Sequence, residues 1–138
     1  MPQFSPDGRW LAFVSDESGE RCVYVARYPG GGARRLISTG TGYAPRWAPD
    51  GRELFYSTGS QLMAVSIVTQ PELEVGRPRK LFDDPDLANP YNDYLFAPAP
   101  DGQRFFITKR TRIEPVRQIH VVLNWFDDVK RKVGAAGK

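Results

Sequence analysis

The tripeptide Pro-Asp-Gly occurs three times in this chain, each time after a small residue and before a polar residue and a strand-like apolar run. The copies lie 43 and then 51 residues apart. A period in the low forties with four strands per unit is typical of β-propeller blades. The nine residues of the repeat are Pro6, Asp7, Gly8, Pro49, Asp50, Gly51, Pro100, Asp101 and Gly102.

The chemistry of this tripeptide indicates a tight reversal between two strands. Proline presets φ for the first turn position, aspartate accepts a bond from a nearby backbone N–H, and glycine supplies the positive φ with which the next strand leaves. We therefore predict that all nine residues are structural turn residues and that the three aspartates are turn formers.

Strand patterns continue after each turn. Behind the strand that ends at Ser5, the first unit predicts strands at 9–15, 21–28 and 33–38. The second unit predicts strands at 52–57, 61–68 and 77–82 with a loop at 69–75, and the third predicts strands at 94–97, 104–109 and 118–123. The one helical signal follows at 125–133, where Asn124 is a suitable cap and apolar residues recur one turn apart.

The predicted fold class is all-β: β-propeller blades of four antiparallel strands, about three blades, forming a partial propeller with a short C-terminal helix. The blades are expected at about 1–40, 43–83 and 93–133, the last with the terminal helix 125–133, and a tail follows at 134–138. Closed propellers have about four to eight blades. About three blades are too few to close a ring, so the chain is either part of a larger propeller or assembles with further copies of itself. A homo-oligomer of two copies would have about six blades.

Composition excludes several classes of protein. The chain is 41% hydrophobic and 25% charged, as in ordinary soluble globular domains. Its net charge of +3 comes from both signs interspersed along the chain, which does not favour nucleic acid as a partner. No apolar run approaches the ~18 residues of a membrane span, and the first residues lack the pattern of a signal peptide. The single cysteine, Cys22, is predicted to be a buried small hydrophobe.

Catalytic and metal-binding motifs are missing. The one histidine, His120, lies in a predicted strand, and no Gly-x-Ser-x-Gly elbow occurs. We therefore predict no catalytic residue, no metal site and no cofactor. The oxygen-rich segment 83–93 is interpreted as a solvated insert between blades, and the glycine-rich 30–32 and 40–42 as linker and turn. The residues predicted to contact a ligand or partner are Tyr91, Asn92, Asp93 and Tyr94.

The first two turns follow Phe4-Ser5 and Trp47-Ala48, and aromatic-rich strands follow the turns. In these features the chain resembles the TolB-type, WD40-like β-propeller repeat family, whose hallmark is a Phe/Trp-Ser/Ala-Pro-Asp-Gly turn before such a strand. The segment 119–130 is similar to the C-terminal ending of propellers in multidomain bacterial proteins, including ones with a Ser/Thr protein kinase domain. The resemblance implies a non-catalytic interaction or ligand-sensing module, the C-terminal part of a larger bacterial protein. Its partner would be another protein or the remaining blades.

The resemblance also leaves an alternative function open. Similar blades form the accessory or gating propellers of prolyl-oligopeptidase-like and tricorn-like peptidases. On either reading we expect the chain itself not to be an enzyme. The sequence leaves the compartment undetermined, with the resemblance slightly favouring an extracytoplasmic, periplasmic one.

Overall fold

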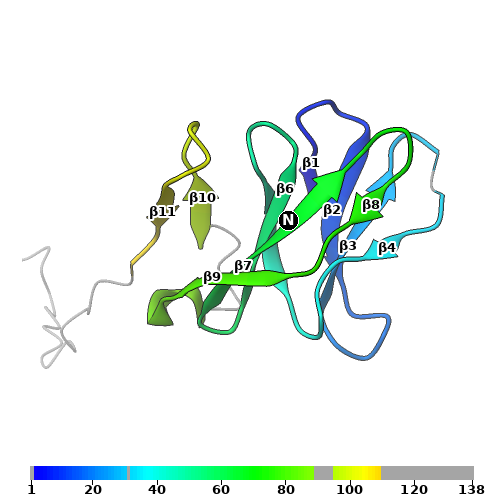
Figure 1. Cartoon of the computed structure of the whole chain (residues 1–138). Helices are drawn as coiled ribbons and strands as arrows, with labels where there is room; N and C mark the ends of the chain where they lie inside the picture. Colours follow the sequence, from blue (N-terminus) through cyan, green and yellow to red (C-terminus); the bar gives the residue numbers. More distant parts are fainter. Residues whose placement is uncertain (1, 31, 89–94, 110–138) are drawn as a thin grey trace, which may run out of the picture.

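The chain folds into antiparallel sheets that lie side by side (Figure 1). The computed structural model describes residues 2–30, 32–88 and 95–109. These residues form eleven strands and one short 3-10 helix, so the predicted all-β fold class is confirmed. The predicted C-terminal helix at 125–133 and the predicted strand at 118–123 lie outside the described residues.

The first sheet contains four strands in chain order, each antiparallel to the next. They are β1 (Gln3–Phe4), β2 (Trp10–Ser15), β3 (Cys22–Arg27) and β4 (Arg35–Leu36). The strand order agrees with the four-stranded first blade that the sequence predicts. Gly42, in the segment that leaves this sheet, is needed for close approach: an added Cβ would lie 3.0 Å from both Ser38 Cβ and Val23 Cγ2.

The second sheet begins in the same way but divides its outer strand into two pieces. Its members are β5 (Tyr43–Trp47), β6 (Glu53–Thr58), β7 (Gln61–Val68), β8 (Glu74–Val75) and β9 (Arg79–Asp83). Because β6 occupies one edge of β7, both β8 and β9 pair with the other edge. The Gly76 N–H also donates to Ser66 O at 2.9 Å. The blade is therefore four strands wide, with a break in the outer strand between Gly76 and Arg79.

This outer strand differs from the sequence prediction, which placed it at 77–82 after a loop at 69–75. Pro78 lacks an amide hydrogen and cannot donate to the sheet, so it interrupts the pairing rather than continuing a regular strand. Pairing starts earlier, at Glu74, and resumes at Arg79.

The third unit contributes the two-stranded sheet of β10 (Phe96–Pro98) and β11 (Phe105–Ile107). Between the second and third units lies η1 (Pro85–Ala88), a 3-10 helix in the segment that the sequence analysis interpreted as a solvated insert. That interpretation is wrong at Leu87, which is only 1% exposed and packs in the core.

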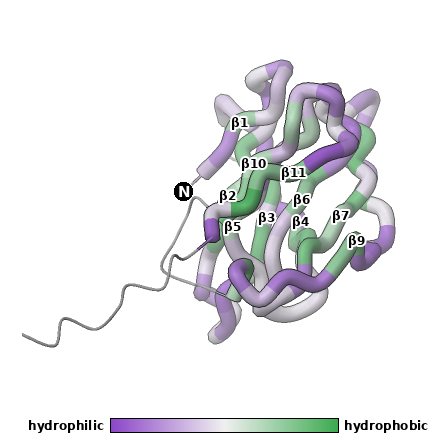
Figure 2. The backbone as a smooth tube through the Cα atoms, turned by 90° about the vertical axis from the view of Figure 1, so that its left-hand side faces the viewer, coloured by the Kyte–Doolittle hydropathy of each residue, from purple (hydrophilic) through white to green (hydrophobic). Residues whose placement is uncertain are grey.

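The core consists of two clusters, one on each face of the second sheet. Successive side chains of β6 point to opposite faces, as in any strand. Leu54 and Tyr56 pack against the first sheet, whereas Phe55 packs towards β10 and β11, with its ring centroid 4.9 Å from that of Phe105. Figure 2 shows that hydrophobic residues are concentrated in the strands and hydrophilic residues in the connecting loops. The three units thus stack face to face.

The first sheet also has an outward face, which points away from this core. Ala12, Val23 and Val25 belong to the cluster shared with the second sheet. The alternate residues therefore point outward; these are Phe4, Leu11, Phe13, Tyr24 and Leu36. Phe4 and Leu36 are 52% and 51% exposed. Among the described residues, no helix has the length and apolar character needed to cross a bilayer.

Candidate binding groove at the repeated turns

The three Pro-Asp-Gly triplets form turns of the same geometry. In each, the glycine has a positive φ, between 66° and 72°, and its N–H donates at 2.9 Å to the carbonyl of the residue before the proline. In each, the aspartate Oδ1 also accepts the backbone N–H two residues ahead, at 3.0 to 3.1 Å. The repeat is therefore an Asx-stabilised hairpin turn that uses all three residue types for local backbone geometry.

The turns lie along one edge of the molecule, the upper edge in Figure 1, and the first two touch. An added Cβ on Gly51 would lie 3.5 Å from Pro6 Cδ. Beside this contact is a cavity of about 500 Å³, which we call the turn groove. Its lining residues come from the first turn, the second turn and the end of β7; they are Ser5, Pro6, Asp7, Asp50, Gly51, Arg52, Ser66, Ile67, Val68, Thr69 and Gln70.

The groove combines two carboxylates with an apolar wall. Asp7 Oδ1 accepts hydrogen bonds from Ser5 Oγ at 2.5 Å and from the Arg9 N–H at 3.1 Å. These two bonds lower the pKa of Asp7 below its ordinary value, so that this carboxylate is ionised at neutral pH. Ile67 is buried in the core beneath the groove, whereas Val68 is 50% exposed.

The carboxylates of the groove differ from that of the third turn. Asp101 Oδ2 accepts a bond from Arg104 Nε at 2.8 Å. At the corresponding position the first turn has Trp10 and the second has Glu53, neither of which is a cation. In the described part of the chain, no hydrogen bond or ion pair reaches Oδ2 of Asp7 or Asp50. Within the described residues, neither groove carboxylate forms an ion pair, although the charge of the nearby Arg9 side chain also helps to lower the pKa of Asp7.

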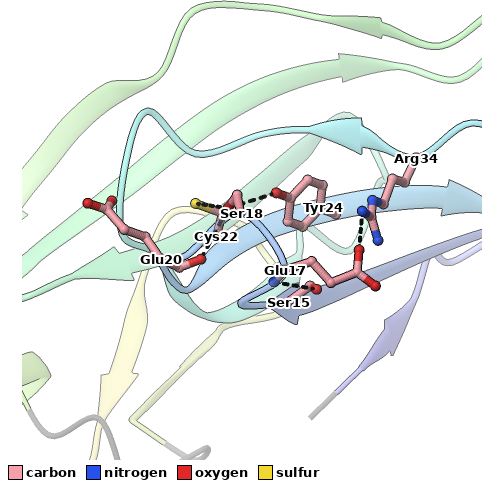
Figure 3. A network of polar contacts seen from close by, with 7 residues as sticks. All are labelled: Ser15, Glu17, Ser18, Glu20, Cys22, Tyr24 and Arg34. Carbon is pink, nitrogen blue, oxygen red and sulfur yellow. Dashed lines mark hydrogen bonds and ion pairs between the residues drawn. The ribbon is translucent and has the colours of Figure 1, made fainter.

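A second polar cluster lies at the β2–β3 turn (Figure 3). The Tyr24 hydroxyl donates to Ser18 Oγ at 3.3 Å, and Arg34 pairs with Glu17 and lies 5.2 Å above the Tyr24 ring. Cys22 is buried, and its thiol donates to Gly40 O at 3.4 Å. The cluster ties the turn to the sheet, and its only thiol is inside the protein. The sequence did not predict the hydrogen bond from the Cys22 thiol to Gly40 O.

The other sequence-predicted residues are placed as follows. The predicted contact residues Tyr91, Asn92, Asp93 and Tyr94 lie outside the described residues, as does His120. Within 2–30, 32–88 and 95–109, no group of three or more His, Cys, Asp or Glu side chains is arranged to hold a metal ion. Sequence reasoning missed the turn groove. The signal that points to it is the 43-residue spacing of two identical turns, which brings them to the same edge of neighbouring sheets.

Comparison with known proteins gives one informative similarity. No protein-family model matches the chain. A segment of 55 residues, 38% of this chain, is 44% identical to "Uncharacterized peptidase YuxL" of Bacillus subtilis (strain 168). The match spans only 8% of the length of that protein. This similarity to a protein named as a peptidase contradicts our expectation that the chain itself is not an enzyme, and that expectation is withdrawn.

Proposed function

We propose that this chain is part of a β-propeller of TolB-type, WD40-like repeats that accompanies a peptidase domain and acts there as an interaction and gating module. The observation that carries the proposal is the 44% identity over 55 residues to a protein named as a peptidase. The repeated turns and the face-to-face stacking of the sheets support the propeller part of it.

The architecture suits such a role. The second sheet is buried on both faces, so the sheets form a packed wall rather than independent hairpins. The Trp47 indole N–H also donates to Gln3 O at 3.2 Å, joining the innermost strands of the first two units. Because the sheets are packed together in this way, the edge that carries the repeated turns, including the turn groove, keeps a constant position relative to a neighbouring domain.

Ligand sensing is the second candidate function. It is favoured by the turn groove, whose volume of about 500 Å³ lies within the range of small-ligand sites. A sensor linked to a kinase requires kinase motifs in the same polypeptide, whereas a gating propeller requires a nucleophile elbow there.

The test uses the full-length protein expressed from its complete open reading frame. We expect a Gly-x-Ser-x-Gly elbow in that reading frame, hydrolysis of short peptide p-nitroanilides, and little hydrolysis of casein, because a gating propeller admits only short chains. Replacement of the elbow serine by alanine should abolish the hydrolysis. Kinase motifs in place of the elbow, together with no peptide hydrolysis, would overturn the peptidase proposal in favour of the sensor.

A further inference from the structure

We propose that the turn groove binds a lysine or arginine side chain of a peptide, with Asp7 and Asp50 facing the cationic head and the exposed flank of Val68 contacting the aliphatic stem. The choice of a peptide as the carrier of the cation rests on the proposed function. The chemistry of the groove is argued independently below.

The first argument is the contrast among three turns that are otherwise alike. In the third turn, Arg104 at the third position after the aspartate bonds to Asp101 Oδ2 at 2.8 Å. The first two turns bring no such cation, and within the described residues Oδ2 of each aspartate is left without a bonded partner. A cation supplied from outside would complete in these two turns the interaction that Arg104 completes in the third.

The second argument is the charge of the whole groove. Its lining includes two carboxylates and one guanidinium, that of Arg52. In the described chain Arg52 forms no ion pair with either aspartate, although its backbone N–H donates to Asp50 Oδ1 at 3.0 Å. The lining therefore has one more negative than positive side chain, and Arg9, which acts on Asp7 through its charge, is not among the lining residues. An excess of negative charge in the lining favours a cation over an acidic side chain.

The third argument is the combination of charge with apolar surface. Pro6, Ile67 and Val68 line the same groove, and Val68 is half exposed. Lysine and arginine carry long aliphatic stems that cover apolar surface while the charged head reaches a polar partner. A metal ion would not use the apolar wall, and the described residues hold no group of three potential metal ligands.

The experiment compares two peptides that differ only in charge. Acetyl-Ala-Ala-Lys-Ala-Ala amide and its norleucine analogue are titrated calorimetrically into the full-length protein, which is first treated with diisopropyl fluorophosphate to prevent hydrolysis. We expect the lysine peptide to bind and the norleucine peptide to bind at least about fivefold more weakly. The variants Asp7→Asn and Asp50→Asn should each weaken lysine-peptide binding by about the same factor, because asparagine keeps the Oδ1 acceptor of the turn but removes the charge.

The matched control is Asp101→Asn, which makes the same change in the turn where the carboxylate is already paired. It should leave binding unchanged. Equal binding of the two peptides, no binding of either, or an equal loss in Asp101→Asn would overturn the proposal. Charge-dependent binding without any peptide hydrolysis would refute only the peptidase function, whereas hydrolysis without charge-dependent binding would refute only the role of the groove.

Discussion

At the scale of single residues, the first turn differs from the other two at the position before proline. Ser5 occupies this position, whereas the corresponding residues are Ala48 and Ala99. Ser5 Oγ donates to Asp7 Oδ1 at 2.5 Å and accepts the Trp10 N–H at 3.0 Å. The hydroxyl thus joins the carboxylate of the turn to the start of β2. Because alanine is found in the two equivalent turns, the turn does not need the hydroxyl to form.

We therefore predict that Ser5→Ala raises the pKa of Asp7 towards its ordinary value without unfolding the protein. The Ser5 hydrogen bond is the largest cause of the lowered pKa, ahead of the Arg9 amide. A carboxyl with a lowered pKa contributes stability above its unfolded-state pKa and loses it as the pH falls through the folded-state pKa. The variant should accordingly show a smaller loss of stability on acidification from pH 5 to about pH 2.

Carbon-detected NMR titration of the aspartate carboxyls measures this shift directly. Asp101 is the internal control: its pKa is lowered by the Gln103 amide and by Arg104, and its turn already has alanine before the proline. Its titration should be unchanged in the variant. An Asp7 midpoint that does not move would show that Ser5 is not the cause of the shift.

At the scale of secondary-structure elements, β6 has the central role because it contributes to both halves of the core. Leu54 faces the first sheet and Phe55 faces β10 and β11, although the two residues are adjacent. Both side chains are almost completely buried. Truncating either of them should leave a cavity, but on opposite sides of the same strand.

We predict that Leu54→Ala and Phe55→Ala each reduce the free energy of unfolding, by about 2–5 kcal/mol. Amide hydrogen exchange should separate the two effects. Phe55→Ala should accelerate exchange in β11 more than in β3, because it removes the contact with Phe105, and Leu54→Ala should do the reverse. Each variant serves as the control for the other. The same exchange pattern in both would show that the two faces of the middle sheet do not pack independently.

The sequence predicted some of these elements and missed others. The turns were recognisable because proline, aspartate and glycine act through local backbone geometry. The break at Pro78 and the short η1 were not, because prolines in both segments resemble loop sequence, and only contact with the second cluster explains why Leu87 is buried. The turn groove depends on two turns meeting across a sheet interface, and sequence spacing alone does not specify the space between them.

At the scale of the whole molecule, the outward face of the first sheet is the main exposed apolar surface of the described residues. Five large hydrophobic residues of the described chain are exposed, and three of them, Phe4, Tyr28 and Leu36, belong to this sheet or the segment that leaves it. The Phe4 and Tyr28 rings contact each other edge to face at 5.0 Å. The second sheet shows how such a face is covered here, namely by another sheet. We therefore propose that a further sheet covers the outward face in the assembled protein.

This proposal predicts that the isolated 138-residue chain associates through the outward face, since apolar surface of this kind favours contact with another copy. Size-exclusion chromatography with light scattering at micromolar concentration should report a dimer, for which two copies of about three blades give a permitted ring of about six. Phe4→Glu combined with Leu36→Glu should shift the chain to a monomer, because burying two carboxylates at the interface is costly. Val68→Glu places a charge at a similarly exposed apolar residue away from this face, and it should leave the dimer intact. A folded wild-type monomer, or a dimer that persists in the double variant, would contradict association through this face.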